Sequence, residues 1–484
     1  MEGRRLLAVL VVVVVQLGGG GVMGNLVFQV KNKFKAAGRE RTLAALKEHD
    51  TRRHGRMLAM DFPIGGNGHP SSTGLYFTKL PLGTPPADYY VQVDTGSDLL
   101  WVNCVGCSKC PTKSDIGIEL ALFDPDKSKT STVVKCDDDV CKLIFDKQYP
   151  GRCSPSVRCM YSVTYGDGSG TDGYFVRDHV QLTQVTGNLK TTTSNATIIF
   201  GCGARQSGDL GSEAALDGIL GLGQANSSML SQLAAAGMVK KEFAHCLDVI
   251  EGGGIFAIGD VVSPKVKTTP LVPDMPHYNV YLEAIAVGGE ALDLPTSLFE
   301  VGDQRGTIID SGTTLAYLPR MLYDLVVTKI LDQQPGLKLH TIEEQFSCVE
   351  FSQNVDDAFP TVSFQFKGSV TLTVYPHEYL FRTRDDLWCI GWQDGGMESH
   401  DGREMILLGD LVLSNKLVIY DVENQTIGWT DYNCSSSITI RDEKSGADYT
   451  VGSHNINSGL NLTVGRIFTI FSLLVALLQS FSVC

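Results

Sequence analysis

The chain has 484 residues, of which 43% are hydrophobic and 19% are charged, and it contains 51 glycines. This composition is typical of a globular, turn-rich protein long enough for two lobes with separate cores, and it excludes a disordered chain. The formal net charge of −14 argues against nucleic-acid binding, because proteins of that class usually present a basic surface.

The first residues have the pattern of an export signal. Arg4 and Arg5 precede an apolar run over residues 6–17, and a glycine-rich stretch ends at Gly24. Because the apolar run is too short to span a bilayer comfortably, this order predicts a secretory signal peptide over residues 1–24.

A basic leader follows the predicted signal. Residues 25–60 contain nine Lys and Arg against three Asp and Glu, whereas residues 61–484 carry a net charge of −21. A basic segment can cover an acidic cleft until the cleft carboxylates take up protons at low pH. Residues 25–73 are therefore predicted to be a prosegment and maturation region. The alternative is a solvated amphipathic helix around residues 43–47.

The body of the chain has an all-β pattern, because short β-type runs alternate with Gly, Pro and Asp. Helical periodicity is clearest at residues 228–239 and 320–331, and a proline-rich stretch suggests a connector between lobes. The predicted organisation is an N-terminal lobe over residues 74–262, a connector over 263–276, a C-terminal lobe over 277–434 and a polar stalk over 435–457.

The cysteine count fits an exported protein. Of 13 cysteines, 12 remain if Cys484 is removed with the C-terminal tail, which predicts six disulfides of undetermined pairing. The close spacing of Cys104, Cys107 and Cys110 would also suit zinc or an iron–sulfur cluster, although the secretory context favours disulfide loops. The predicted disulfide cysteines are Cys104, Cys107, Cys110, Cys136, Cys141, Cys153, Cys159, Cys202, Cys246, Cys348, Cys389 and Cys434.

The C-terminal end has the pattern of a lipid-anchor signal. Residues 467–483 are largely apolar, no basic cluster follows them, and the small residues Asn457, Ser458 and Gly459 precede them by a short spacer. This order predicts a glycosylphosphatidylinositol anchor signal over residues 458–484, with attachment near Asn457 or Ser458 on the outer face of the plasma membrane. The alternative is a single spanning helix. Glycosylation sequons predict glycans at Asn195, Asn226, Asn424 and Asn433, and a fifth sequon at Asn461 lies in the tail.

Two segments 216 residues apart are near copies. In residues 91–102 and 307–318, an apolar strand leads to Asp, a hydroxyl residue, Gly, a second hydroxyl residue and another apolar strand. Each is followed later by an apolar pair and a glycine, at Gly221 and Gly409. This duplication predicts two related lobes that each contribute one carboxylate to a shared site. It also predicts a strand crossing beneath each Asp loop, where glycine permits close approach.

The loop residues suit a carboxylate pair. Gly96 and Gly312 allow the tight turns, Ser97 and Thr313 can donate to the Asp of their own loop, and Thr95 and Ser311 can bind across to the other loop. If the loops meet, Asp94 and Asp310 come within hydrogen-bonding reach and cannot both ionise easily. At acid pH the ionised carboxyl can then take a proton from water while the protonated one donates to a peptide carbonyl. This chemistry needs no metal or cofactor, and none is predicted.

Over residues 74–434 the chain resembles the pepsin-like aspartic proteases, and within them the extracellular, membrane-anchored members of plants. Further matches are Phe123-Asp124-Pro125, the glycine loop around Gly221 and the segment Phe200-Gly201-Cys202-Gly203. Aspartic proteases are the standard example of two carboxyls sharing one proton. The resemblance assigns the catalytic roles to Asp94 and Asp310, and a flap to Tyr165, Gly166 and Gly168 with Trp101 bonding the flap tyrosine.

The same resemblance implies an all-β, bilobal double β-barrel or sandwich with a few short helices and an active-site cleft between the lobes. It implies an endopeptidase that acts on proteins or peptides at acid pH, and we expect a monomer. Ser311 occupies a motif position where Thr is commoner in this family. Serine keeps the hydroxyl and lacks only a methyl group, so we expect little effect on the site.

Two rival functions remain open at this level. Ala244-His245-Cys246 and Asp310-Ser311-Gly312 resemble the histidine and serine motifs of chymotrypsin-like proteases, but that assignment leaves Asp94 and the repeat unexplained. The other rival is a catalytically silent binding protein of the same fold, such as a glycosidase inhibitor. Both Asp residues, the trailing hydroxyls, Tyr165 and Trp101 are intact, which favours the enzyme.

Overall fold

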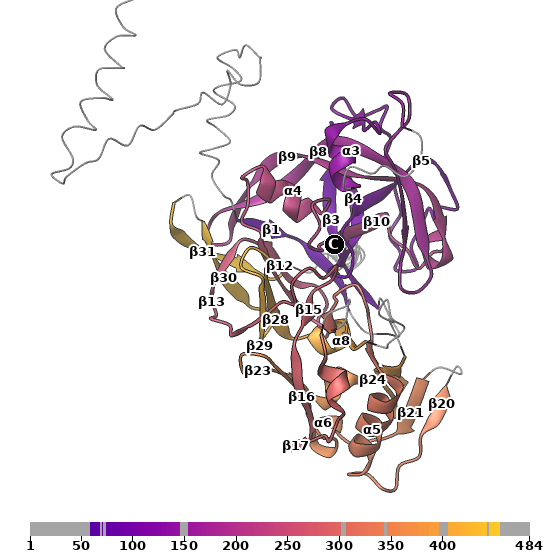
Figure 1. Cartoon of the computed structure of the whole chain (residues 1–484), viewed down its shortest axis with the longest axis vertical. Coiled ribbons are helices and arrows are strands. Elements are labelled where there is room, and N and C mark those ends of the chain that lie inside the picture. The colour runs from indigo at the N-terminus through magenta and orange to yellow at the C-terminus, as the bar shows by residue number, and fades with distance from the viewer. Residues whose placement is uncertain are drawn as a thin grey trace, which may run out of the picture. The chain divides into compact units, whose positions relative to one another are not determined.

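A computed structural model describes most of the chain between Ala59 and His454 (Figure 1). The described residues are 59–67, 70, 74–145, 153–301, 306–342, 346–384, 386–395, 405–442 and 445–454. The predicted signal peptide, most of the predicted prosegment, the sequon at Asn461 and the anchor residues Asn457 and Ser458 lie outside this set. Within the described residues, no helix combines the length and the apolar character needed to cross a bilayer.

β-strands dominate the structure, which confirms the predicted all-β class. The largest sheet has 15 strands. Its main path runs β14 (Thr268–Pro270), β29 (Thr426–Asp431), β28 (Lys416–Asp421), β11 (Glu242–Leu247), β12 (Gly254–Ile258), β1 (Met60–Phe62), β8 (Gly170–Gly187), β9 (Lys190–Ser207), β5 (Leu100–Ser108), β10 (Gly218–Gly221), β4 (Ala87–Asp94), β3 (Leu75–Leu82) and β2 (Ile64–Asn67). Two further strands, β6 (Thr132–Val133) and β7 (Met160–Thr164), pair with β8.

This sheet contains strands from both halves of the chain. β11 pairs antiparallel with β28, so that Ala244 lies opposite Ile419 across a sequence separation of more than 170 residues. On these two strands the buried rings of Phe243 and Tyr420 stack in parallel with centroids 4.4 Å apart. The predicted boundary between the lobes therefore divides the sequence but does not divide the hydrogen-bonded sheet.

Four smaller sheets complete the β-structure. They are β13 (Asp260–Ser263), β30 (Ser437–Asp442) and β31 (Ala447–Gly452); β15 (Asn279–Val280), β18 (Thr307–Ile309), β27 (Leu407–Leu408), β19 (Ala316–Leu318) and β26 (Trp392–Asp394); β17 (Glu290–Ala291), β16 (Leu282–Val287), β22 (Val362–Phe366) and β23 (Val370–Val374); and β20 (His340–Ile342), β21 (Phe346–Glu350), β25 (Leu387–Ile390) and β24 (Leu380–Arg384).

The helices are short. They are α3 (Asp139–Ile144), α4 (Met229–Ala235), α5 (Arg320–Leu331), α6 (Val355–Ala358), α7 (Pro376–Tyr379) and α8 (Asp410–Leu413), with 3₁₀ turns η2 (Gly208–Gly211) and η3 (Thr296–Phe299). Helix α5 has the predicted bounds, because its apolar residues Leu322, Val326 and Ile330 recur on one buried face. Helix α4 is shorter than predicted. It starts after Ser228, whose side chain accepts a hydrogen bond from Ser231 N, and it ends at Ala235.

The predicted internal repeat is confirmed. In the first half, β10 runs parallel beside β4 with Gly221 opposite Asp94. In the second half, β27 runs parallel beside β18 with Leu408 opposite Ile309. A methyl group on Gly409 would clash with two backbone carbonyl oxygens of the second Asp loop, so glycine is required for this close approach.

Both ends of the body differ from the predicted boundaries. Residues 437–442 and 447–452, expected to be part of a polar stalk, form the paired strands of the β30–β31 hairpin, whose Ile438, Ile440 and Val451 are buried. The cause is the alternation of apolar and polar residues along β30, which gives the hairpin a buried face. At the other end, β1 and β2 place residues 60–67 in the large sheet rather than in a separate maturation region.

The two ends of the described body contact each other. The His454 side chain lies 2.8 Å from an Asp61 carboxylate oxygen on β1, and the His454 backbone forms a β-bridge with Gly254. The hydrogen bond to Asp61 raises the pKa of His454, although burial of the ring opposes the shift.

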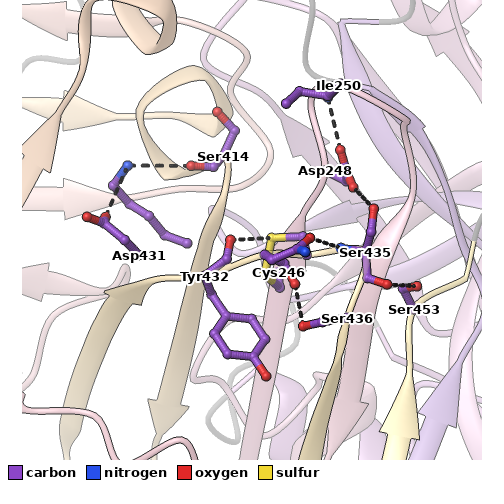
Figure 2. The surroundings of a disulfide bond; sticks show 12 residues. Cys246, Asp248, Ile250, Ser414, Asp431, Tyr432, Ser435, Ser436 and Ser453 are labelled. Carbon is purple, nitrogen blue, oxygen red and sulfur yellow. Dashed lines mark hydrogen bonds and ion pairs between the residues drawn. A yellow bond between two sulfur atoms is a disulfide. The ribbon is translucent and has the colours of Figure 1, made fainter.

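Six disulfides pair the 12 described cysteines, as predicted. They are Cys104–Cys202, Cys107–Cys110, Cys136–Cys153, Cys141–Cys159, Cys246–Cys434 and Cys348–Cys389. These pairs rule out a metal cluster of Cys104, Cys107 and Cys110. Figure 2 shows Cys246, on β11, in its disulfide to the segment after β29, beside Tyr432 and Ser435. This bond joins cysteines 188 residues apart. A disulfide that closes so long a loop removes much conformational entropy from the unfolded chain and thereby stabilises the folded state.

Candidate active site

The two predicted Asp loops meet in the structure. Asp94 is the last residue of β4, and Asp310 directly follows β18. A methyl group on Gly96 would lie 2.6 Å from Asp310 Oδ1, and one on Gly312 would clash with the Asp94 carboxylate. Each loop therefore lies against the carboxyl group of the other, and the two carboxyls come within hydrogen-bonding reach.

The hydrogen bonds of the two carboxyls follow the internal repeat. In the second loop, Asp310 Oδ1 accepts from Gly312 N at 2.8 Å and Oδ2 accepts from Thr313 Oγ1 at 2.7 Å. In the first loop, the same bonds come from the Gly96 backbone at 2.8 Å and from the Ser97 hydroxyl. All four donors stabilise the ionised form of the carboxyl group that they contact.

The cross-link between the loops is less symmetrical than the sequence predicts. The Ser311 backbone N–H donates to Thr95 Oγ1 at 2.8 Å, and the Thr95 hydroxyl lies 3.5 Å from the Ile309 carbonyl oxygen. The Ser311 hydroxyl, in contrast, is buried and has no hydrogen-bond partner. The predicted bond across from the Ser311 hydroxyl is therefore absent from the described residues. Besides Thr95, Gln92 links the loops, because its Nε2 donates to the Gly312 carbonyl oxygen at 3.0 Å.

The buried position of the pair changes its titration. Burial and the neighbouring Asp310 carboxylate raise the pKa of Asp94 to about 7, against the opposing hydrogen bonds from Ser97 and Gly96. The pair can therefore hold a proton at acid pH, as acid–base catalysis by two carboxyls requires.

A third carboxyl, which the sequence analysis did not identify, lies near the pair. Asp410 begins α8 directly after Gly409. Burial, followed by the charges of Asp310 and Asp94, raises its pKa well above the usual range. The only sequence signal was its position after the second apolar-pair–glycine motif.

The predicted flap is a hairpin beside the first Asp loop. Tyr165, Gly166 and Gly168 lie in the turn between β7 and β8, where Gly168 has a φ of 80°. Trp101 Nε1 donates to Tyr165 Oη at 2.7 Å, as the resemblance implies. Burial, and then the Asp94 charge, raises the pKa of Tyr165, so its hydroxyl stays protonated.

A cavity of about 490 Å³ lies between this flap and the first Asp loop. Its lining combines the loop and flap residues with apolar side chains, among them Leu99, Ile144, Phe145, Tyr161, Val163 and Phe175. Ile144 and Phe145, at the end of α3, were not predicted as site residues, because short-range patterns do not reveal which face of a small helix meets a distant strand. The cavity can take a bulky apolar side chain.

The serine-protease alternative does not fit this geometry. His245 on β11 is fully buried, and its Nε2 lies 3.1 Å from Tyr420 Oη rather than beside Ser311. Burial lowers the pKa of His245 to about 3. The pair of Ser311 and His245 thus lacks the hydrogen bond that activates a serine nucleophile.

The predicted glycosylation sites lie at the surface of the described structure. Asn195, Asn226, Asn424 and Asn433 are exposed, as glycan attachment requires, and glycosylation there stays a prediction. Among the described His, Cys, Asp and Glu side chains, no group of three is placed to hold a metal ion.

Known proteins with the same organisation are found by sequence and by structure. Family models described as Xylanase inhibitor N-terminal and Xylanase inhibitor C-terminal match residues 76–260 and 277–431. Aspartic proteinase 36 of Arabidopsis thaliana is 53% identical, over 99% of this chain and 98% of that protein. Aspartic proteinase 39 of the same plant is 52% identical, over 99% of both chains.

Solved structures support the same fold. The structure titled edgp has a TM-score of 0.63 at 20% identity, covering 78% of this chain and 95% of that chain. Soybean Basic 7S globulin has a TM-score of 0.61 at 20% identity, covering 77% and 96%. At this level of identity the likeness concerns the fold alone.

Proposed function

The chain belongs to the pepsin-like aspartic proteases of plants, and on this premise we propose that it is an endopeptidase that uses Asp94 and Asp310 to hydrolyse peptide bonds at acid pH. The observation that carries the proposal is the convergence of the two Asp loops beneath the Tyr165 flap. Relatives that match almost the whole chain are named aspartic proteinases, which favours this function over a silent binding protein.

The proposed mechanism follows from the hydrogen bonds of the pair. One of the two carboxyls is ionised and takes a proton from a water molecule, which attacks the carbonyl carbon of the scissile peptide bond. The protonated carboxyl donates to the carbonyl oxygen as negative charge develops there. The carboxyl that took the water proton then gives it to the amide nitrogen and the C–N bond breaks. The other carboxyl recovers its proton from a hydroxyl of the tetrahedral intermediate, so the pair ends in its starting protonation state. General acid–base catalysis of this kind contributes roughly 10²–10⁴-fold to the rate.

The shape and lining of the cavity support a preference for peptides with a bulky apolar side chain. The cavity opens beside Ser97 and Tyr165, so a side chain held there would belong to a residue close to the scissile bond. The flap would close over an extended peptide and exclude water from the carboxyl pair.

Export and membrane attachment are part of the proposal. They rest on the N-terminal apolar run, the disulfide-rich body and the C-terminal small-residue, spacer and apolar-tail pattern. In this proposal the protein acts at the outer face of the plasma membrane, and its basic leader delays activity until the pH falls. Release from membranes by phosphatidylinositol-specific phospholipase C would support the lipid anchor, and retention would contradict it. A chain lacking residues 25–58, which keeps all of β1, should fold poorly or lose acid-triggered activation.

The central test is the exchange of either aspartate for its amide. We expect Asp94→Asn and Asp310→Asn to lower pepstatin-sensitive cleavage of a peptide library at acid pH by at least about 10²-fold. The exposed Asp293→Asn, which creates no glycosylation sequon, is the matched control and should cleave like the wild type. Circular dichroism establishes that each variant is folded. Full activity of either folded catalytic variant would refute the assignment.

A further inference from the structure

A glutamine on the first catalytic strand reaches the second Asp loop. Gln92 lies on β4 two residues before Asp94, and alternate side chains of a strand leave the same face. Its Nε2 donates to the Gly312 carbonyl oxygen at 3.0 Å, across 220 residues of sequence. The side chain is half-buried, and its register partners in the sheet are the uncharged Phe77 on β3 and Ile219 on β10. The first half of the chain thus holds the second loop by a backbone atom.

The Gly312 carbonyl belongs to a short run of peptide groups that contacts a catalytic carboxyl. The Gly312 N–H donates to Asp310 Oδ1 at 2.8 Å. On the N-terminal side of this peptide group, the Ser311 N–H donates to Thr95 Oγ1 at 2.8 Å. On its C-terminal side, the Gly312 carbonyl accepts from Gln92. The peptide group that donates to Asp310 therefore lies between two peptide groups that are tied to the first half of the chain.

Position 312 cannot restrict its own backbone. A methyl group there would clash with the Asp94 carboxylate, so only glycine fits. Glycine has the widest choice of backbone dihedral angles, and a change in these angles would turn the Gly312 N–H away from Asp310. A hydrogen bond from outside the loop removes this freedom, and Gln92 supplies it at the carbonyl group.

The Gln92 link has no counterpart in the other half of the internal repeat. The residue two positions before Asp310 is Ile308, which lies in a buried apolar cluster and has no hydrogen-bonding group in its side chain. It cannot donate to the Gly96 carbonyl, which is the equivalent acceptor in the first loop. The link is therefore one-sided, and its effect falls on Asp310.

We propose that Gln92 is a positioning residue that, through the Gly312 carbonyl, fixes the Asp310 carboxyl relative to Asp94. This inference rests on the proposed function. Gln92 acts on the carboxyl through the loop backbone and not on the reacting atoms. Its loss should therefore lower the rate of the chemical step, measured as kcat, and leave peptide binding, measured as KM, nearly unchanged.

The first test removes the hydrogen-bond donor from the full chain. Gln92→Met keeps the length of the side chain, and we expect kcat to fall about fivefold to tenfold, as the loss of one hydrogen bond implies, with KM unchanged within about twofold. Gln334→Met is the matched control, because Gln334 is also half-buried and its Nε2 donates to the Ala358 carbonyl oxygen at 2.8 Å, outside the two Asp loops. Its kcat and KM should stay at wild-type values. Pepstatin-sensitive cleavage of a peptide substrate gives both constants.

The second test makes the link depend on pH. In Gln92→Glu, a protonated carboxyl can donate to the Gly312 carbonyl oxygen, whereas the ionised form has no proton to donate and repels that oxygen. The charged groups in contact with Gly312 are Asp94 and Asp310, and a glutamic acid ordinarily ionises near about pH 4.3. We expect kcat to be within about twofold of the wild type at about pH 3, and the ratio of the two to fall about fivefold to tenfold by about pH 6. The ratio should stay constant for Gln334→Glu.

The kinetics separate the positioning role from its alternatives. Equal kcat values for folded Gln92→Met and Gln334→Met, with an active wild type, would overturn the proposal. So would a raised KM at unchanged kcat, which would place Gln92 in contact with the peptide. If Gln92→Met does not fold, a constant ratio of Gln92→Glu to wild-type kcat across the pH range would overturn it as well. A wild type without pepstatin-sensitive cleavage would instead refute the proposed function.

Discussion

At the scale of single residues, Gly221 and Gly409 show how the repeat constrains the sequence. Each lies where one strand passes beneath an Asp loop, and a methyl group at either position would clash with the backbone of that loop. The glycines therefore belong to the geometry of the carboxyl pair even though they carry no chemistry of their own.

We expect Gly409→Ala to destabilise the protein by about 1–3 kcal/mol, because the added methyl group meets the Thr313 and Leu315 carbonyl oxygens and forces the loop to shift. Urea unfolding monitored by tryptophan fluorescence measures the change. Gly336→Ala is the control, because no atom lies within 4 Å of a methyl group built at that position. Equal stability of the two variants would contradict the close approach.

The residues that sequence analysis identified in the site share one property, which is a local motif. Each catalytic Asp stands three positions before its trailing hydroxyl, Ser97 or Thr313, so the turn chemistry is visible in the sequence. The unpaired Ser311 hydroxyl and the bond from the Ser311 N–H to Thr95 Oγ1 depend on loops that are more than 100 residues apart, and no local pattern encodes that contact.

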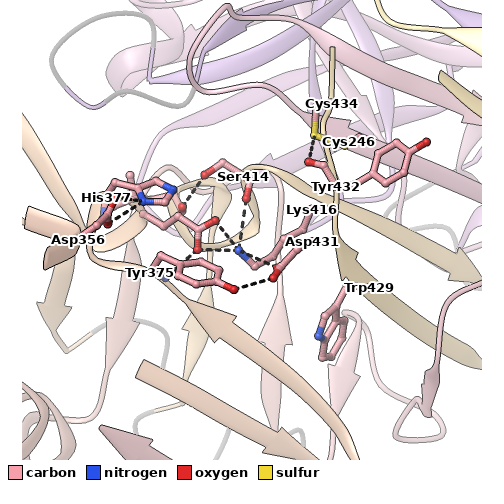
Figure 3. A network of polar contacts seen from close by, with 12 residues as sticks. Cys246, Asp356, Tyr375, His377, Ser414, Lys416, Trp429, Asp431, Tyr432 and Cys434 are labelled. Atoms are coloured by element: carbon pink, nitrogen blue, oxygen red, sulfur yellow. Dashed lines mark hydrogen bonds and ion pairs between the residues drawn. A yellow bond between two sulfur atoms is a disulfide. The ribbon is translucent and has the colours of Figure 1, made fainter. Parts of the chain in front are cut away.

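At the scale of secondary-structure elements, a buried ion pair connects β28 to α7. Lys416 Nζ lies 2.6 Å from both carboxylate oxygens of Glu378, and both side chains are at most 2% exposed. Figure 3 shows the Lys416 ammonium group together with Ser414, Asp431 and Tyr375 around it. Because each charge is desolvated, each depends on the other.

We expect Lys416→Met to destabilise the protein by about 3–5 kcal/mol, since it leaves the Glu378 carboxyl group buried without its partner. Lys79→Met is the control, because its pair with Asp88 is exposed and should contribute at most about 1 kcal/mol. Thermal and urea unfolding give both values. If the Lys416→Met/Glu378→Leu double variant were as unstable as Lys416→Met, the loss would come from packing and not from the unpaired charge.

Elements in which apolar residues recur with one clear period were predicted well from the sequence. Elements in which many polar residues hide that period were predicted poorly. Helix α5 follows its apolar spacing and has the predicted bounds. The β30–β31 hairpin was missed because its polar composition suggested a stalk, although Ile438 and Ile440 alternate with polar residues as a half-buried strand requires. The pairing of β11 with β28 could not be predicted from the sequence either, because the pattern of one strand does not specify which strand it pairs with.

At the scale of the whole molecule, buried titratable groups tie stability to pH. Asp94 has a pKa of about 7 in the folded state against 3.8 unfolded, and the Asp410 pKa is raised as well. Their stabilising effect is therefore fully present below about pH 4 and is lost as the pH rises through the folded-state value. His245 acts in the opposite sense, because its folded pKa of about 3 is below 6.5, and stability is lost as the pH falls between those values.

Burial also raises the pKa of Glu242 to about 7, so Asp94 and Glu242 together outweigh the one imidazole, and we expect the folded body to be more stable at pH 5 than at pH 7. The slope should be about 1.4 kcal/mol per pH unit for each net proton. Chemical unfolding at a series of pH values measures it. Asp94→Asn should flatten the slope and His245→Gln should steepen it. A wild type that becomes steadily more stable from pH 5 to pH 7 would contradict the raised carboxyl pKa values.

The contact between Asp61 and His454 would allow a circular permutation of the described body. A short flexible linker could join the start of β1 to the end of the β30–β31 hairpin, and the new N- and C-termini could be placed in an exposed turn elsewhere. Such a circular permutant would keep every strand pairing of the large sheet while changing the order in which those strands leave the ribosome.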